Sequence, residues 1–292
     1  MPLRSINILT SLLILPLQAQ GNDPQFEIIR ATFAQTAPMA LDGDLGDLSV
    51  RQYEASSFLS KPIPLTDSLK VIPMFAYGIT QLNFSIPSAL PIEEESLHSA
   101  SLSAIFLENF GNSPWLAVAW MRAELATDYQ GIAAEDLTFD VSLGLSYRFS
   151  DAFTLGVGFV ITNLNGREQI FPGLNFNWQP NEKLAIGNVG PNLFIRYVVN
   201  DSWFLSTEGT PGGGNWNIND AAGQSRTLEL DSYWISLNTN HRIYRSLWLS
   251  AGIGYTLGNE ISIHGNHTGS PSFSREMQGA PMAQISLSLA TW

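Results

Sequence analysis

The 292-residue chain contains no cysteine, and charged side chains make up only 14% of it. An exported protein without cysteine has no disulfide frame, so its own packing and backbone hydrogen bonds must stabilise it. Beyond its first residues the chain also lacks a run of roughly 18 apolar residues, the length that a membrane-spanning helix needs. These absences exclude a small disulfide-built module and a helical membrane protein.

Basic residues are also scarce, which leaves a formal net charge of −12. Nucleic-acid partners require basic surfaces, so no nucleic acid is expected as a partner. Two explanations of the acidity stay open. An acidic lumen or acidic outer loops would favour cations over anions in a pore. Alternatively, the charge only keeps an exported protein soluble.

The first 21 residues are typical of a signal peptide. Arg4 supplies a positive charge, residues 6–17 are mostly apolar, and small residues around Ala19 and Gly21 suit a cleavage site. We therefore expect residues 1–21 to be removed. Residues 22–292 then form a single exported domain, because one large β domain can hold a chain of this length.

Residues 137–161 alternate between apolar and small or polar side chains, in two runs separated by Ser150 and Asp151. Successive side chains of a strand point to opposite faces, so this alternation predicts a hairpin with one apolar face. The apolar positions are Leu137, Phe139, Val141, Leu143, Leu145, Tyr147, Phe149, Phe153, Leu155, Val157, Phe159 and Ile161.

The same alternation recurs along the chain and predicts about fourteen strands. They start near Phe26, Leu48, Leu69, Leu97, Trp115, Leu137, Ala152, Glu168, Lys183, Asn192, Ser202, Ser232, Leu247 and Pro281. The pair near Lys183 and Asn192 is the weakest, because Gly187, Gly190 and Pro191 interrupt it and proline is tolerated mainly at sheet edges, strand starts and bulges. If that pair is one kinked element, about twelve strands are the alternative; either even count returns both termini to the periplasm.

Two features favour a membrane barrel over a soluble all-β domain. Short turns beside aromatic residues alternate with longer connections, as in outer-membrane barrels. In the run 247–257, one face carries Ser250, Gly252 and Gly254, where a soluble surface would carry more Lys and Glu. The sequence thus predicts an all-β, transmembrane, antiparallel up-and-down β-barrel in the bacterial outer membrane. The longer connections, expected on the outside, are 39–47, 87–95, 128–135, 209–224 and 258–279.

Four segments carry a resemblance to known proteins: YRFSDAFTLGVG (147–158), IFPGLNFNWQPN (170–181), LFIRY (193–197) and LSAGIGY (249–255). They resemble a family of predicted outer-membrane β-barrel proteins of unknown function, found in several Gram-negative lineages. The resemblance covers most of the mature chain and implies a fold and a compartment. It implies outer-membrane lipid and the barrel assembly machinery as partners, and it supplies no catalytic residues.

Such barrels often end in an aromatic residue that is preceded by apolar residues at alternate positions and recognised by the assembly machinery. Trp292 supplies the aromatic residue, but Ile285, Leu287 and Leu289 have the opposite parity. A shift of one residue moves a side chain to the other face of a strand. We therefore expect either a bulge near Thr291 or a Trp292 that lies outside the strand register.

The inner face should carry the functional side chains. An arginine on the lipid face costs about 2–4 kcal/mol, so charges at membrane depth should point into the lumen. Asp140, Ser142, Arg148 and Arg196 are therefore candidate pore-lining residues. They could line an open pore or form an ion network that closes it. The glycine-rich segment 211–214 is expected to be a flexible loop, folded into the mouth or disordered.

Two acidic segments could bind cations. Residues 42–47 could ligate calcium through clustered carboxylates, but they lack the EF-hand spacing and also fit a turn. Residues 93–95 are three consecutive glutamates, and like-charge runs usually remain solvated. A solvated loop is preferred there to a cation bridge to lipopolysaccharide. No metal or cofactor is assigned.

Histidine and serine positions give little support for catalysis. His98 and Ser99 are the residue types of outer-membrane lipid hydrolases, but neighbours on a strand point to opposite faces and cannot form the required hydrogen bond. His264 and His267 are expected in a polar surface loop, since two histidines alone make a poor zinc site.

Three functions remain as hypotheses. The preferred one is a pore or solute-binding channel of unknown substrate, which passes cations or neutral small solutes and is not an enzyme. The alternatives are an outer-membrane esterase or lipase that acts on lipid, and a structural or adhesive barrel with a filled lumen. The fold alone does not choose among them, because function depends on the site.

Overall fold

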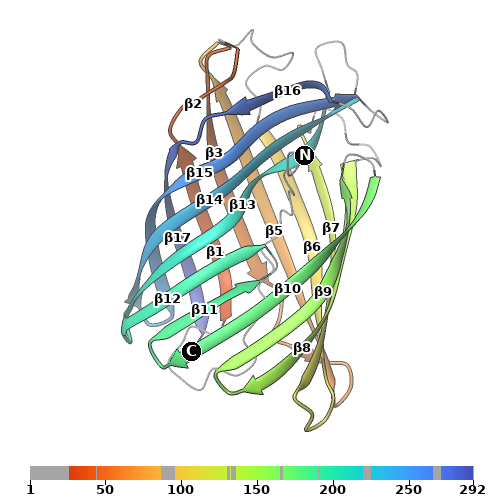
Figure 1. Cartoon of the computed structure of the whole chain (residues 1–292), viewed down its shortest axis with the longest axis vertical. Coiled ribbons are helices and arrows are strands. Elements are labelled where there is room, and N and C mark those ends of the chain that lie inside the picture. Colours follow the sequence, from red (N-terminus) through yellow and green to blue (C-terminus); the bar gives the residue numbers. More distant parts are fainter. Residues whose placement is uncertain are drawn as a thin grey trace.

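A computed structural model of the chain describes residues 26–291, except residues 44, 87–95, 130–131, 133–135, 165–166, 190, 220–224 and 266–270. These residues form an almost continuous β-sheet (Figure 1). None of the described elements is a helix long and apolar enough to cross a membrane. The expected signal peptide and Trp292 lie outside the described residues.

Fourteen strands follow one another in chain order around a closed antiparallel ring. They are β1 (Phe26–Thr36), β3 (Asp47–Phe58), β5 (Leu69–Phe84), β6 (Ser96–Asn109), β7 (Trp115–Thr127), β8 (Leu137–Ser150), β9 (Phe153–Leu164), β10 (Arg167–Asn181), β11 (Leu184–Val189), β12 (Asn192–Asn200), β13 (Trp203–Asn219), β14 (Ser225–Tyr244), β15 (Leu247–Gly265) and β17 (Pro281–Thr291). Three short strands, β2 (Met39–Ala40), β4 (Ile63–Pro64) and β16 (Pro271–Met277), pair with β3, β5 and β15.

The predicted all-β barrel of about fourteen strands is confirmed. The weak pair near Lys183 and Asn192 forms two separate strands, β11 and β12, so the alternative of twelve strands is wrong. Both are short, with 6 and 9 residues. Period-2 alternation was a sufficient signal even for these short strands.

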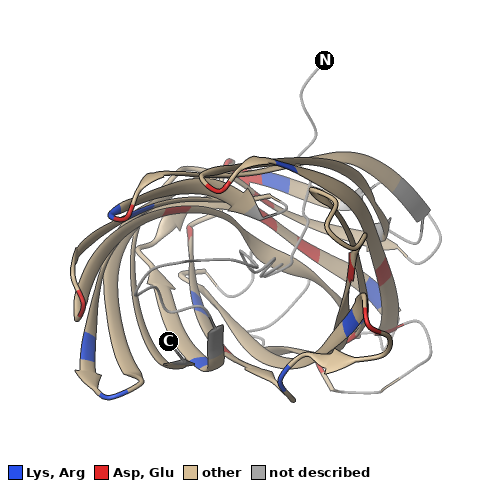
Figure 2. Cartoon of the chain, turned by 90° about the horizontal axis from the view of Figure 1, so that it is seen from below, with Lys and Arg blue, Asp and Glu red and all other residues tan. Residues whose placement is uncertain are grey.

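Strands β1 and β17 close the ring, with Phe26 opposite Thr291 and Phe33 opposite Ile285. The start of β1 and the end of β17 therefore lie at the same end of the barrel. We call this end the terminal end and the opposite end the loop end. The register shifts between Glu27 and Ile29, so an irregularity lies opposite the last residues of β17. Seen along the barrel, the ring is closed, and Lys, Arg, Asp and Glu occupy little of its wall (Figure 2).

The apolar side chains of the alternating runs point outward. Phe139 is 63% exposed, whereas the next residue, Asp140, is 5% exposed and faces inward. On the outside of the terminal end, aromatic rings follow one another along the turns, with Trp115 4.8 Å from Tyr147 and Phe149 5.6 Å from Phe153. An apolar outer face with an aromatic rim is the pattern of a barrel wall that meets lipid.

The glycine-rich segment 211–214 is not a loop, which corrects the prediction. It lies inside β13, which continues to Asn219 and pairs with β14 throughout. Gly213 has φ +97°, and a Cβ there would lie 1.9 Å from the backbone oxygen of Leu230. Glycine is required at this position because β13 changes direction in close contact with β14.

One further loop prediction needs correction. Most of the expected connection 258–279 is strand, since β15 extends to Gly265 and β16 covers Pro271–Met277. Strand β9 ends at Leu164 and β10 begins at Arg167 at the loop end, whereas β11 and β12 stop short of that end, since Leu193 at the start of β12 pairs with Gly209 in the first half of β13. The strands therefore extend to different heights at the loop end.

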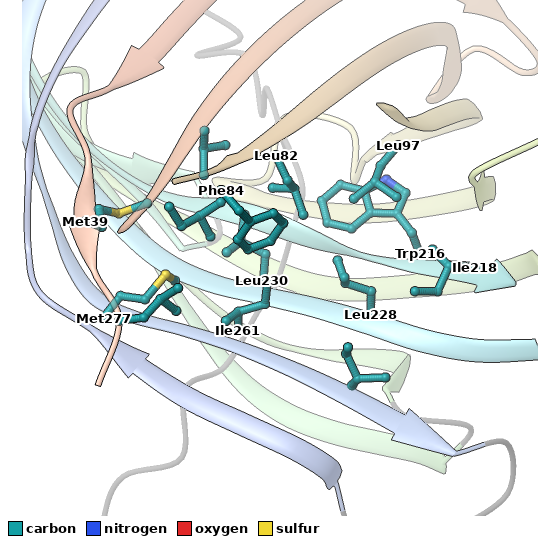
Figure 3. Packing of buried hydrophobic residues seen from close by; sticks show 14 of the residues in the cluster. Met39, Leu82, Phe84, Leu97, Trp216, Ile218, Leu228, Leu230, Ile261 and Met277 are labelled. Carbon is teal, nitrogen blue, oxygen red and sulfur yellow. The ribbon is translucent and has the colours of Figure 1, made fainter. Parts of the chain in front are cut away.

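Apolar side chains fill the loop end of the barrel. Side chains from opposite walls meet there, with Phe84 and Leu82 of β5 facing Trp216, Leu228 and Leu230 of β13 and β14 (Figure 3). We call this cluster the loop-end core; its buried members are Met39, Leu41, Leu48, Val50, Leu82, Phe84, Leu97, Ala126, Trp216, Ile218, Leu228, Leu230, Ile261, Ile263, Met277 and Ala280. Because these side chains are in close contact, they block the barrel axis between the walls that carry them.

The tip of β13 crosses the barrel to β7. Asn217 of β13 pairs in parallel with Thr127 of β7, and the Asn217 side chain donates a 3.0 Å hydrogen bond to Asp136. The backbone N–H of Asn219 donates to Asp128 at 2.8 Å. At the loop end the wall therefore closes into a smaller ring that leaves out β8 to β12.

Candidate functional site

A charged cluster lies on the inner face of β7 and β8, within the ring. The Arg122 guanidinium donates to Asp140 through Nε at 2.9 Å and through Nη2 at 2.5 Å. The same Nη2 lies 3.0 Å from the Glu124 carboxylate, and Thr162 donates a hydrogen bond to Asp140. We call Arg122, Glu124 and Asp140 the charged trio.

Strand alternation places the charged trio on the inner face. Arg122 and Glu124 are two residues apart on β7, so both point inward, and Asp140 lies opposite Arg122 on β8. All three side chains are largely buried. The trio therefore places two carboxyl groups against one guanidinium.

The predicted pore-lining residues all have inward parity. Asp140, Ser142 and Arg148 alternate along the inner face of β8, and Arg196 lies on the inner face of β12 with its guanidinium 5.9 Å from the Phe204 ring centroid. The structure brings Asp140 together with Arg122, which the sequence reasoning did not single out. A role of these four residues in lining a conducting path stays a prediction.

A hydrogen-bonded polar network lines another part of the inner face. Gln284 of β17 donates to Asn238 at 2.6 Å and to Ser236 at 3.1 Å, both on β14. Asn240 donates to Ser206 of β13 at 3.2 Å. The network satisfies buried polar groups and gives this side of the lumen a polar lining.

Three glycines lie side by side on the inner face of β8, β9 and β10. Gly144 pairs with Gly158, and Gly158 pairs with Gly173. We call these residues the glycine row. A Cβ at Gly144 would contact only the Val157 backbone at 3.5 Å, and a Cβ at Gly173 would contact only the Gly158 backbone at 3.8 Å. The structure therefore leaves space inside the wall at both ends of the glycine row.

The wall formed by β3, β5, β6 and β7 is apolar near the terminal end. Inward side chains of β3, β5, β6 and β7 form a second buried cluster around Trp120, 5.6 Å from the Arg122 guanidinium. Its other members are Phe58, Ile72, Met74, Ile105, Leu107 and Val118. The inner face thus has an apolar side and a polar or glycine-lined side.

The structure gives no support to the two histidines considered for catalysis. His98 faces outward, where its Nδ1 lies 2.8 Å from the Tyr77 hydroxyl, while Ser99 has the opposite parity on β6. His264 is buried in β15, which corrects its assignment to a surface loop. His267 lies outside the described residues.

His264 belongs to a polar cluster at the loop end that the sequence reasoning missed. Its Nε2 lies 2.9 Å from Ser262 Oγ and 3.0 Å from Glu229 Oε2. A catalytic triad places the nucleophile and the acid on different ring nitrogens. Here both share Nε2, so the geometry is not that of a triad.

The acidic segments show no metal site in the part of the chain that the structure describes. Gly43 and Gly46 adopt positive φ values of 90° and 82°, as a turn at residues 42–47 requires. Asp44 and residues 93–95 lie outside the described residues.

A closed antiparallel ring with an apolar outer face, an aromatic rim and inward charges defines a transmembrane β-barrel of the outer-membrane type. The chain belongs to the family described as Domain of unknown function (DUF6268), whose sequence model matches residues 75–287. No curated protein matches the chain.

Solved outer-membrane barrels are similar in fold. An outer membrane channel from Pseudomonas putida F1 is 11% identical, with 89% of this chain and 94% of that chain covered and a TM-score of 0.46. The NanC porin is 7% identical, with 89% and 98% covered and a TM-score of 0.38. The TodX monoaromatic hydrocarbon channel is 10% identical, with 90% of each chain covered and a TM-score of 0.36.

Proposed function

We propose that the chain is an outer-membrane channel for small solutes and not an enzyme. The observation that carries this proposal is the inner face around the glycine row, where side-chain volume is missing from the wall of a closed ring. A barrel with a purely structural role gains stability from a filled lumen, so space left beside the wall favours passage or binding of a solute.

The proposal places the barrel in the outer membrane, with its terminal end toward the periplasm and its loop end outside. The apolar outer face and the aromatic rim at the terminal end support this orientation. Insertion would require removal of residues 1–21 and the barrel assembly machinery, and the outer face would contact outer-membrane lipid.

The charged trio supports a preference for cations or neutral solutes over anions. Two carboxylates, Glu124 and Asp140, face one guanidinium, Arg122, on the inner face of the wall. At this site the excess of carboxyl groups attracts cations and repels anions, while Arg148 and Arg196 lie elsewhere on the same inner face.

A structural barrel with a filled lumen is the second candidate, and the loop-end core is the observation in its favour. This core closes only the smaller ring that β7 and β13 complete at the loop end. The glycine row lies on β8 to β10, outside that ring. The loop-end core therefore fills one part of the barrel and leaves the wall of β8 to β10 uncovered.

Conductance of the refolded chain in planar bilayers tests the proposal. We expect steady conductance with a cation preference. Asp140→Asn should shift the reversal potential toward anions because Arg122 then faces one carboxylate fewer, and Arg122→Gln should shift it toward cations. Heat-modifiable mobility on gels confirms that each variant is folded. Inserted, folded protein that never conducts would contradict the channel.

A further inference from the structure

The barrel wall is interrupted between β10 and β13. Strands β11 and β12 have 6 and 9 residues, while β10 and β13 on either side have 15 and 17. Strand β11 pairs with β10 from Asn177 toward the terminal end, and β12 reaches Gly209 of β13. Beyond these points, no described strand lies between β10 and β13. We call this interruption the wall break (Figure 1).

The edge of β10 at the wall break is finished by side chains instead of a strand. Asn188 accepts a hydrogen bond from the backbone N–H of Phe176 at 2.8 Å and donates one to the backbone oxygen of Leu174 at 2.6 Å. Along a regular strand, Pro172 presents the same edge, and it has no N–H to leave without a partner. The edge is built to stand without a neighbouring strand.

The facing edge of β13 has a similar feature. Pro211 lies two residues beyond Gly209, the last position of β13 that pairs with β12. In the hydrocarbon core a backbone group without a hydrogen-bond partner is costly, because no water is present to replace the partner. A proline on each edge removes one N–H that would otherwise need a partner at the wall break.

The wall break lies within the lipid-facing part of the wall. Outward side chains beside it are apolar, with Ile170 68% exposed on β10 and Leu174 and Leu193 also exposed. The outer rim of the break therefore meets hydrocarbon and not water.

The inner side of the wall break is lined by glycine. Gly173 ends the glycine row on β10, and a Cβ there would meet no side chain within 4 Å. The loop-end core and the pairing of Asn217 with Thr127 close the axis of the smaller ring. Among the described parts of the wall, Gly173 therefore lies at the edge of the wall break and outside the smaller ring that holds the loop-end core.

We propose that the wall break is a lateral passage by which small, uncharged apolar molecules move between the lumen and the hydrocarbon layer of the membrane. The proposal rests on the proposed channel function and specifies the neutral solutes of that function as apolar molecules that take a lateral route. Ions and polar solutes are excluded from this route because entering hydrocarbon removes their hydration without replacing it. The aliphatic rim of Ile170, Leu174 and Leu193 offers an apolar molecule a continuous apolar contact.

Fluorescence quenching tests whether the wall break opens to lipid. The chain has no cysteine, so a single introduced cysteine can carry a bimane label on the full barrel in liposomes. The test site is Gly173→Cys, beside the break. Leu174→Cys on the outer face is the lipid-exposed control, and Ser103→Cys on the inner face of β6 is the enclosed control.

We expect brominated lipid to quench the label at residues 173 and 174 but not at residue 103. A label at residue 173 that behaves like the label at residue 103 overturns the lateral passage. This readout does not depend on ion conductance, so a barrel that fails to conduct yet shows lipid quenching at residue 173 would contradict the ion-channel proposal alone.

Naphthalene uptake by Gram-negative cells that express the full chain tests the substrate class. Gly173→Phe places a ring beside the wall break, and Gly144→Phe places the same ring at the other end of the glycine row, two strands away. We expect Gly173→Phe to lower uptake at least about tenfold more than Gly144→Phe does, a difference of about 1.4 kcal/mol in barrier. Equal uptake by the two folded variants would overturn the proposal.

Discussion

Asn217 of β13 pairs with Thr127 of β7, although five strands, β8 to β12, separate these two strands in the ring. The contact is parallel, whereas the neighbouring pairs of the ring are antiparallel. It divides the barrel wall into two rings. The smaller ring, at the loop end, leaves out β8 to β12, and the larger ring, at the terminal end, includes them. The loop-end core occupies the smaller ring, and the wall break lies in the part of the wall that the smaller ring leaves out.

A charge on the outer face should be more costly than the same charge on the inner face. Leu143 and Ser142 are neighbours on β8, and Leu143 is exposed on the outer face. We expect Leu143→Arg to lower the free energy of unfolding by about 2–4 kcal/mol because the guanidinium enters hydrocarbon. Ser142→Arg, the matched control, should cost far less. Urea titration of the barrels in liposomes measures both, and equal losses would contradict the assignment of faces.

Trp216 should hold the loop-end core together. It is 4% exposed among apolar side chains from both walls. We expect Trp216→Ala to lower the free energy of unfolding by about 3–5 kcal/mol through the cavity left behind, and to raise single-channel conductance. Trp178→Ala removes an exposed indole from the outer face and serves as the control. Unchanged conductance in a folded Trp216→Ala barrel would show that the loop-end core does not limit passage.

The glycine row should tolerate a methyl group at one member and not at another. A Cβ at Gly158 would lie 2.3 Å from the backbone oxygen of Leu143, whereas a Cβ at Gly144 would lie 3.5 Å from its nearest neighbour. Backbone cannot move aside as a flexible side chain does, so Gly158→Ala should cost about 1–3 kcal/mol. Gly144→Ala should have little effect. The fraction of heat-modifiable, folded barrel after refolding compares the two, and identical yields would contradict the prediction.

Period-2 alternation was enough to predict the strands, because most lipid-facing positions of a barrel are apolar. Arg122 and Glu124 escaped notice for a physical reason. Their inner-face neighbours Val118 and Trp120 are apolar, while the outer face of β7 includes small alanines, so the run shows little contrast between faces. Asp140 and Arg148 could be assigned to the inner face from the sequence, because the small or polar residues of that face alternate clearly with the apolar residues of the outer face on β8.

The loop-end features depend on contacts between distant segments, which a pattern along one strand does not reveal. The segment 211–214 has the composition of a loop, but close contact with Leu230 of β14 selects its glycines. Likewise, Ser262 and His264 lie two residues apart on β15, whereas Glu229 lies on β14. Only the pairing of β14 with β15 brings the three residues together. Tertiary contact therefore decided the local structure in both cases.

The contact between Asn217 and Thr127 also has a consequence for the order of folding. Hairpins form quickly because their partners are close in sequence, whereas a contact between distant residues has a larger cost in chain entropy. The segment between residues 127 and 217 can lower that cost only after β8 to β12 have paired and shortened it. The smaller ring therefore closes late, and the two halves of the barrel should mature at different times during insertion.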